Sequence, residues 1–451
     1  MRYHSIITTL CLAATSLSTP TSPSSTPQNP LLTPSGDEAD RNISLALFAD
    51  LEELSRVVDI SYCVGLTGIQ HPFLCASRCE DFPNFELVDT FNTGPLMSDS
   101  CGYIALDHGR EKGGRKRVLV AFRGTYSIAN TIVDLSTVPQ EYVPYPEQPG
   151  NGTGKGVDGN PRRGGRWRWR FWWPWRWAEE EEVRVEGEKE TPKCMNCTVH
   201  TGFWTSWSNT RELIIPHILR LRDQYPDYKL DLVGHSLGGA VAALAGLEFN
   251  GMGLDPRITT FGEPRIGNEG LRDYLDAVFN LPNSDSKKEG KEEQNRYLHS
   301  GRYRRITHID DPVPLLPLQE WGYRAHAGEI YISKPSLQPT VSDVHLCLGD
   351  EDVNCIAGAE VDEDWFDTTR TMNRPQIGDE VPEDEEMRLL GKRWGIPIPA
   401  RYKMWQLFFA HRDYFWRLGL CLPGGDPLDW GRERYRFGDG DRGEVEGRED
   451  L

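Results

Sequence analysis

The sequence predicts an α/β protein whose central sheet is mostly parallel and is covered by helices on both faces. Short β-prone runs alternate with longer helical patterns along most of the 451 residues, a pattern typical of this class. In the clearest case, the alternating run 228–233 precedes a tight turn and then the small, apolar helical run 240–249. The hydrophobic content of 38% is sufficient for one large domain with insertions.

Composition also constrains partners and compartment. The formal net charge of −18 argues against nucleic acid or an anionic bilayer as the principal partner. An apolar run at 6–17 follows a charged start and predicts a signal peptide over residues 1–18. This run is too short to span a membrane, and no later run is long enough. We therefore expect a secreted, extracellular protein without a transmembrane segment.

The remaining chain divides by composition. Residues 19–40 are rich in Ser, Thr and Pro, which predicts a disordered or pro-peptide stretch. Residues 41–421 are interpreted as a single domain, and residues 422–451 as a polar tail. Two segments of the domain differ in composition from their surroundings and are interpreted as insertions, near 144–193 and near 356–396.

The first half of the domain begins with a helix from residue 46 that ends near Tyr62 and Cys63, because apolar residues recur there at helical spacing. Three strands follow, two that alternate and one that is continuously apolar: 85–91, 102–106 and 118–122. After them, Ile128, Ile132, Val133 and Leu135 share one face of a short amphipathic helix.

The second half continues the alternation of strands and helices. A long helical segment is expected over 203–225, and the strand and helix of the opening paragraph come next. They are followed by a strand over 257–261, a helix over 268–279, a strand over 303–309 and a terminal aromatic helix over 404–418.

Ser236 stands at the turn between the strand and the helix, with Gly234 and Gly238 two residues away on either side. Glycine is needed at both places because side chains there would collide across so sharp a turn. The turn raises the serine hydroxyl above the sheet, where the helix N-terminus presents N–H groups and a positive dipole. Ser236 is therefore predicted to be a nucleophile. The alternative is an ordinary turn whose glycines relieve packing.

A serine hydroxyl is a poor nucleophile unless a histidine takes its proton and an acid orients that histidine. When the serine occupies such a turn, the acid follows it in the chain at the end of a later strand. Asp310 and Asp311 both fit, because they follow a strand and precede the turn that Pro312 forces. Either can be the acid on this reasoning.

The histidine should follow the acid and lie near the C-terminus. Three histidines follow Asp311: His326, His345 and His411. His411 is the one that comes after the second insertion, and we expect it to be the base.

Several stretches resemble the class 3 (filamentous-fungal) triacylglycerol lipases of the α/β-hydrolase superfamily. They are FRGTYSI at 122–128, VHTGF at 199–203, VGHSLGGA at 233–240, FGEPRIG at 261–267, THIDDPVP at 307–314, GYRAH at 322–326 and the segment from His411 to Cys421. The resemblance covers about 60–421, less the insertions. It implies an α/β-hydrolase fold with a short helical lid.

The same resemblance assigns roles to residues. Its Asp-x-Val-Pro pattern selects Asp311 over Asp310 and makes His326 structural. It places the oxyanion donors at Thr125 and at the backbone N–H of Leu237. The helix with Ile128, Ile132, Val133 and Leu135 corresponds to the lid. Asn130 and Thr131 stand where the family often has tryptophan, which leaves open a helix that only packs on the core.

Nine of the ten cysteines remain after the signal peptide, so disulfides are expected. The resemblance pairs Cys63 with Cys421, Cys75 with Cys79 and Cys347 with Cys355. Cys194 and Cys197 are close enough for a local disulfide, which leaves Cys101 as a thiol. A single C-x-x-C is weak evidence for zinc or redox chemistry, and both are rejected. Three asparagines head glycosylation sequons: Asn42, Asn151 and Asn196.

The Arg/Trp tract, residues 166–177, lies within the first insertion. Tryptophan and arginine both favour a membrane–water interface, so one hypothesis is docking on a lipid droplet. The alternatives are a disordered loop neutralised by the glutamates at 179–182, or translated non-coding sequence.

The leading hypothesis is a secreted serine-dependent carboxylic ester hydrolase that acts on acylglycerols at a lipid–water interface. It forms an acyl-enzyme and uses neither metal nor cofactor. A feruloyl-type or phospholipid esterase on the same fold is the first alternative, and a non-catalytic lipid-surface binding protein is the second. The oligomeric state stays open.

Overall fold

A computed structural model describes residues 41–94, 100–109, 114–125, 139–144, 192–281, 301–356, 410–423, 425–427 and 435. The predicted signal peptide, the lid residues, Asn151, the Arg/Trp tract and nearly all of both insertions lie outside these ranges. Within them, no helix is both long enough and apolar enough to cross a membrane.

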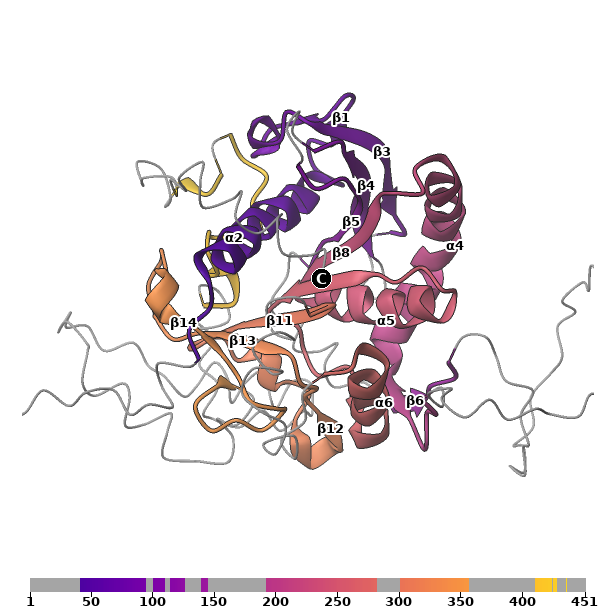
Figure 1. Ribbon diagram of the computed structural model, residues 1–451, viewed down its shortest axis with the longest axis vertical. Helices are drawn as coiled ribbons and strands as arrows, with labels where there is room; N and C mark the ends of the chain where they lie inside the picture. Colours follow the sequence, from indigo (N-terminus) through magenta and orange to yellow (C-terminus); the bar gives the residue numbers. More distant parts are fainter. Residues whose placement is uncertain are drawn as a thin grey trace, which may run out of the picture. The chain divides into compact units, whose positions relative to one another are not determined.

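The main sheet has eight strands in the order β14-β13-β11-β9-β8-β5-β4-β3 (Figure 1). The pairs from β5 to β13 are parallel, and the pairs at both edges are antiparallel. The mostly parallel sheet is thus confirmed. Its strands are β3 (Phe85–Asn92), β4 (Cys101–Asp107), β5 (Arg117–Phe122), β8 (Lys229–His235), β9 (Arg257–Phe261), β11 (Tyr303–His308), β13 (Glu329–Ile332) and β14 (Val344–Leu346).

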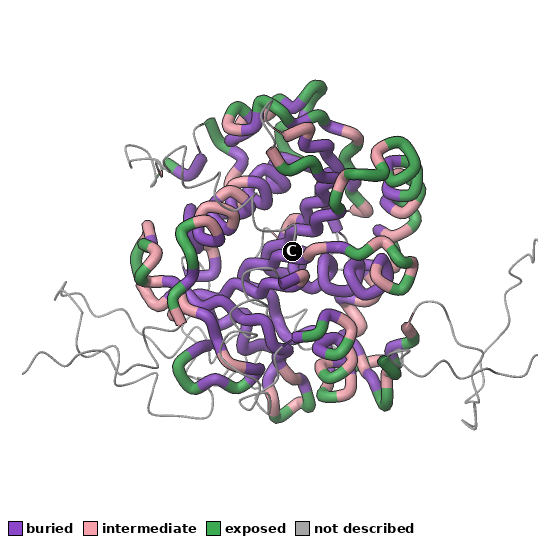
Figure 2. The backbone as a smooth tube through the Cα atoms, viewed as in Figure 1, coloured by how far each residue is buried: buried purple, intermediate pink, exposed green. Residues whose placement is uncertain are grey.

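Helices cover both faces of this sheet. Helix α2 (Leu45–Ile60) packs on one face, and α4 (Thr201–Gln224), α5 (Leu237–Gly251) and α6 (Glu269–Phe279) pack on the other. Strand β5 shows the division, because Val118 and Val120 contact the cluster of α4 to α6, whereas Leu119 joins the cluster of α2. Burial on both faces explains why this strand is continuously apolar. Figure 2 shows the buried strands at the centre, with exposed residues on the outer faces of α4 and α6, whereas α5 is buried along nearly its whole length.

Local signals fix the helix ends. Ser44 precedes α2 and its hydroxyl accepts a hydrogen bond from the N–H of Leu47 at 3.1 Å. Asn268 does the same for the N–H of Leu271 at the start of α6. Asn280 ends α6 in the left-handed conformation, with φ of 56°. Side-chain caps of this kind satisfy backbone groups that a helix leaves without partners.

Smaller elements surround the main sheet. A four-stranded sheet joins β12 (Tyr323–Arg324), β10 (Gly267–Asn268), β7 (Thr198–His200) and β6 (Pro139–Glu141), and a two-stranded one joins β1 (Ile69–Gln70) and β2 (Leu74–Cys75). The 3-10 helices of the described part of the chain are η1 (Ser61–Cys63), η2 (Cys79–Asp81), η4 (Val313–Leu315), η5 (Gln319–Trp321), η6 (Val341–Asp343) and η8 (Ala410–Arg412).

The helix predicted over 404–418 is wrong in the part that the structure describes. After the short η8 the chain runs irregularly, and the N–H of Leu418 bonds back to the carbonyl of Arg412 at 2.8 Å. Tyr414, Phe415 and Trp416 are consecutive and all buried. Tertiary contacts override the helical pattern here, because the Tyr414 hydroxyl donates to Asp311 and the Trp416 ring N–H donates to Glu52.

Candidate active site

Ser236 occupies a strained turn between β8 and α5. Its φ and ψ are 58° and −128°, a backbone conformation that residues other than glycine rarely adopt. A Cβ on Gly234 would lie 2.1 Å from the carbonyl oxygen of Gly238, and a Cβ on Gly238 would lie 2.4 Å from the carbonyl oxygen of Phe122. Steric conflict therefore explains why both positions are glycine. The turn has the sharp strand-to-helix geometry that the G-x-S-x-G pattern predicts.

Backbone donors surround this serine. The N–H of Ser236 is itself bonded to the carbonyl of Phe261 at 2.9 Å. Helix α5 begins at Leu237, and first-turn N–H groups have no acceptor inside their helix. The N–H of Leu237 is therefore available to an acceptor above the serine, where the helix dipole adds positive potential.

The loop after β5 packs directly on the serine. A Cβ on Gly124 would stand 2.8 Å from the Cβ of Ser236 and 2.5 Å from the hydroxyl oxygen of Tyr62. Only glycine lets the loop approach so closely. Thr125, the next residue, is half-buried and is the last described residue before the segment predicted to be the lid.

The structure brings Asp311 to His411. The Nδ1 atom of His411 lies 3.0 and 2.9 Å from the two carboxylate oxygens of Asp311, and both side chains are buried. Asp311 also accepts hydrogen bonds from the Tyr414 hydroxyl and, at 2.9 Å, from the Val313 N–H. Asp310, by contrast, is half-buried, and its N–H donates to His308.

These partners determine the charge of Asp311. Burial alone would raise its pKa, but His411, Tyr414 and the N–H of Val313 together lower the pKa below the usual value. Asp311 is therefore a carboxylate at neutral pH. Because a carboxylate only accepts hydrogen bonds, Nδ1 of His411 carries the proton in this pair.

The other nitrogen of His411 has a different environment. Nε2 is buried, and among the described residues it has no hydrogen-bond partner, Ser236 included. With Nδ1 protonated, Nε2 carries a lone pair that can accept a proton. Catalytic hydrogen bonds are often open in a protein without substrate. Gly262 packs against the ring, since a Cβ there would lie 2.9 Å from Cε1 of His411.

The two remaining histidine candidates lie elsewhere. His326 is bonded through Nε2 to Glu263 at 3.0 Å and through Nδ1 to the carbonyl of Ala327 at 2.7 Å. His345 lies on the edge strand β14 and contacts the Ser333 hydroxyl at 3.2 Å. Neither is bonded to Asp311 in the described part of the chain.

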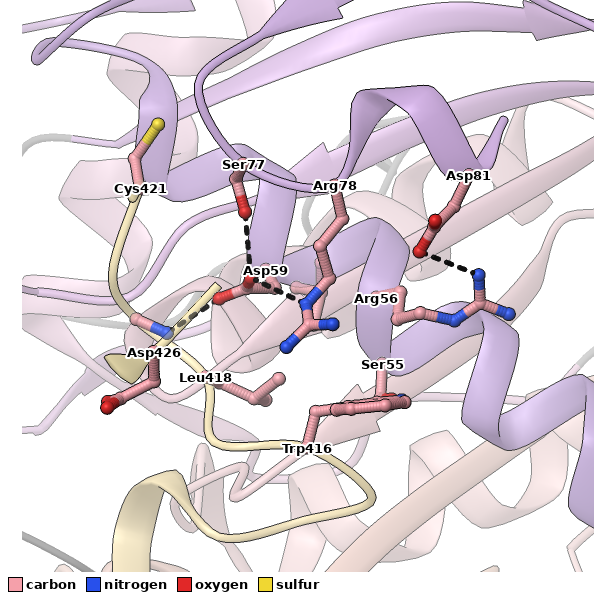
Figure 3. A network of polar contacts seen from close by, with 12 residues as sticks. Ser55, Arg56, Asp59, Ser77, Arg78, Asp81, Trp416, Leu418, Cys421 and Asp426 are labelled. Atoms are coloured by element: carbon pink, nitrogen blue, oxygen red, sulfur yellow. Dashed lines mark hydrogen bonds and ion pairs between the residues drawn. The ribbon is translucent and has the colours of Figure 1, made fainter. Parts of the chain in front are cut away.

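The segment that carries His411 is fixed to the rest of the fold by Asp59, near the end of α2 (Figure 3). The Asp59 carboxylate accepts from the N–H of Gly419 at 2.9 Å and from the Ser77 hydroxyl at 3.2 Å, and it lies 3.6 Å from Nε of Arg78. The Arg78 guanidinium in turn stacks over Trp416 at 4.2 Å. Burial raises the pKa of Asp59 to about 6, although Arg78 and Gly419 oppose the change.

Four disulfides join cysteines of the described residues, and three have the pairing that the resemblance implies. They are Cys63–Cys421, Cys75–Cys79, Cys347–Cys355 and the local Cys194–Cys197. The first joins residues 358 positions apart and ties the segment after His411 to the end of α2. Cys101 keeps its thiol, which donates to Asn92 at 3.0 Å.

Two further observations concern cofactors and modification. In the described ranges, no group of three or more His, Cys, Asp or Glu residues could hold a metal ion. Asn42 and Asn196, the two sequon asparagines within those ranges, are both exposed.

Sequence reasoning missed three residues of this site. Tyr414 escaped notice because its segment was assigned to a helix. Tyr62 and His235 form a hydrogen bond to each other at 2.5 Å across 173 positions, which no local pattern reveals. Only their places in the sequence could have drawn attention to them. His235 directly precedes Ser236, and Tyr62 directly precedes the disulfide-bonded Cys63.

The chain is similar to known proteins over most of its length. The model of the family described as Lipase (class 3) matches residues 119–321. The chain is 49% identical over 445 residues to "Secreted mono- and diacylglycerol lipase 2" of Gibberella zeae, covering 96% of each chain. It is 47% identical over 417 residues to "Lipase A" of Sodiomyces alcalophilus, covering 88% of this chain and 87% of the relative.

A solved structure agrees with these sequence relatives. The crystal structure of Lip2 lipase from Yarrowia lipolytica superposes with a TM-score of 0.56 at 26% identity, covering 85% of this chain and 97% of that one. A relative at 49% identity spans almost the whole chain, and the fold agrees. The chain therefore belongs to the class 3 lipases, carboxylic ester hydrolases with the α/β-hydrolase fold.

Proposed function

We propose that the protein hydrolyses acylglycerol esters with Ser236 as nucleophile, His411 as general base and Asp311 as the group that orients His411. The observation that carries the assignment is the state of His411. Its Nδ1 is held by a buried carboxylate, while its buried Nε2 has no partner within the described ranges. A histidine held in this way can take a proton from the serine on the neighbouring turn.

In the first step, the Ser236 oxygen attacks the ester carbonyl carbon as its proton moves to Nε2 of His411. The negative charge of Asp311 stabilises the imidazolium that forms. The imidazolium then protonates the leaving glyceryl oxygen, and the acyl group stays on Ser236. Water attacks this acyl-enzyme with His411 again as base, which releases the fatty acid and restores the serine.

The negative charge on the carbonyl oxygen needs donors that are already in place. The N–H of Leu237 and the backbone N–H or hydroxyl of Thr125 are proposed for this role. Support comes from the start of α5 at Leu237 and from the close packing of Gly124 on Ser236. One such donor contributes about 3 kcal/mol of transition-state stabilisation.

The substrate class rests on the relatives. One at 49% identity is named a secreted mono- and diacylglycerol lipase, so we infer that acylglycerols are the substrates and that partial glycerides are preferred to triacylglycerols. Secretion is inferred on the same ground, with residues 1–18 as signal peptide and Asn42, Asn151 and Asn196 as glycosylation candidates. A lid formed by the helix with Ile128 and Leu135 stays a prediction, as does interfacial docking by the Arg/Trp tract.

The test compares rates on emulsified monoolein, diolein and triolein, on tributyrin below and above its solubility limit, and on methyl ferulate. Ser236→Ala should abolish every activity while the protein stays folded. Ser206→Ala is the matched control, because Ser206 is also fully buried and its hydroxyl has no partner among the described residues. Turnover by Ser236→Ala would refute the mechanism. Hydrolysis of the ferulate alone would refute the substrate class.

A further inference from the structure

Three buried polar groups form a chain beside the proposed catalytic residues. The Tyr62 hydroxyl lies 2.5 Å from Nδ1 of His235, and Nε2 of His235 lies 2.8 Å from the backbone carbonyl of His411. The N–H of Gly124 donates to the Tyr62 oxygen. The side chains of Tyr62 and His235 are both about 2% exposed.

The direction of each proton follows from the chemistry of the groups. A carbonyl oxygen only accepts, so Nε2 of His235 must donate to His411. Burial lowers the pKa of His235 to about 3, with the neighbouring His411 adding to the effect, and the ring is therefore neutral and has one proton. Nδ1 of His235 must then accept, and Tyr62 must donate. Burial raises the pKa of Tyr62, which keeps its proton in place.

The chain of hydrogen bonds joins the parts that an ester hydrolase must hold together. Gly124 belongs to the loop that packs on the serine, and His235 immediately precedes Ser236. His411 stands on η8, a short helix within an irregular segment. The rings of His235 and His411 are also stacked, with centroids 4.7 Å apart and planes 28° apart.

We propose, on the assumption that Ser236 and His411 act as assigned above, that Tyr62 and His235 are positioning residues for catalysis. They hold the backbone of His411 and the 123–125 loop in place relative to Ser236. Neither residue touches the reacting atoms. Asp311 fixes one edge of the His411 ring, while His235 fixes the backbone and covers one face of the ring.

Neutrality of His235 matters during turnover. His411 becomes an imidazolium when it takes the serine proton, and a second positive charge stacked on it would oppose that step. A neutral ring with a defined tautomer supplies packing and a donor without this repulsion. Tyr62 specifies that tautomer, because its donated proton is compatible only with an unprotonated Nδ1.

The test measures kcat and KM on a soluble ester, p-nitrophenyl butyrate, for Tyr62→Phe, His235→Phe and the double variant. Each kcat is expressed per serine titrated with an alkyl phosphonate, so unfolded protein is not counted. Tyr103→Phe is the matched control, since the Tyr103 hydroxyl is equally buried and donates to the carbonyl of Val57 in α2, away from the site.

We expect Tyr62→Phe to lower kcat about tenfold to a hundredfold with KM nearly unchanged, because small misplacements of catalytic groups are costly. The double variant should be no worse than the more damaged single variant, because both changes break one chain. His235→Gln keeps one donor and one acceptor and should recover part of the activity that His235→Phe loses.

Three results would overturn the proposal. They are a kcat for Tyr62→Phe equal to that of Tyr103→Phe, strictly additive losses in the double variant, or no recovery with His235→Gln. The controls separate this proposal from the proposed function. If Ser236→Ala is inactive while Tyr62→Phe is normal, only the positioning role fails. If Ser236→Ala is active, the proposed function itself fails.

Discussion

Both carboxylate oxygens of Asp311 lie within 3.0 Å of Nδ1 of His411, in a buried setting where Tyr414 and a backbone N–H also donate to that carboxylate. The acid is thus held from three directions before it orients the histidine. A carboxylate fixed in this way specifies one tautomer and one ring orientation, which a more loosely held acid would leave variable.

The first prediction separates the two neighbouring acids. Asp311→Asn replaces an acceptor with an amide that can donate to Nδ1, which favours the wrong tautomer of His411. We expect kcat to fall about 10⁴-fold, the size of the effect known for this change in serine proteases. Asp310→Asn is the matched control and should stay close to wild type. Reversed results, measured on a soluble ester at pH 7 to 8, would make Asp310 the acid.

Sequence reasoning succeeded where the signal is local. The turn at Ser236 was predictable because steric conflict at Gly234 and Gly238 acts over four residues, and the flanking strand and helix are long and periodic. The long strands of the sheet centre were predictable for the same reason. Each is buried on two faces. In β5 a continuously apolar run records that burial, whereas β8 was recognised by its alternation.

Sequence reasoning failed where structure depends on distant parts of the chain. Strand β13 holds a fully buried glutamate, Glu329, whose partners Arg305 and Thr307 lie on the neighbouring β11. A search for apolar runs does not find β13, because the strand has only four residues and one of them is a glutamate. The choice of Asp311 over Asp310 needed the family resemblance, because both aspartates satisfy the positional rule equally. The segment after His411 is fixed by tertiary contacts, which override its helix-like composition.

The second prediction concerns pH and Asp59. Its pKa is about 6 in the fold against 3.8 for an unperturbed aspartate, so the folded protein holds this proton more tightly than the unfolded chain does. The resulting stabilisation is fully present below about pH 3.8 and is lost as the pH rises through about 6. A shift of this size corresponds to about 3 kcal/mol in the free energy of unfolding.

Asp59→Asn removes the titration. The free energy of unfolding in urea is measured for wild type and variant from pH 3.5 to 7.5. The contributions of the other titrating groups cancel when the variant's value is subtracted from that of wild type at each pH. We expect wild type to lose about 3 kcal/mol relative to the variant across this range. A difference independent of pH would show that Arg78 and Gly419 compensate fully for the burial of Asp59.

The last prediction compares two disulfides of very different span. Cys63–Cys421 closes 358 residues, whereas Cys75–Cys79 closes four. In the chain-entropy model, the long closure stabilises the fold by about 5 to 6 kcal/mol and the short one by about 2 kcal/mol.

Paired Cys→Ser substitutions at each bridge test this difference, with the short bridge as the control. Removal of Cys63–Cys421 should lower the melting temperature more and should also lower kcat, because the segment from Ala410 to Cys421 carries His411. The hydrogen bond from the Gly419 N–H to Asp59 does not involve the disulfide, so we expect kcat to be reduced rather than lost in that variant. Equal effects of the two removals on both measurements would mean that contacts such as those of Asp59 fix the His411 segment without the covalent tie.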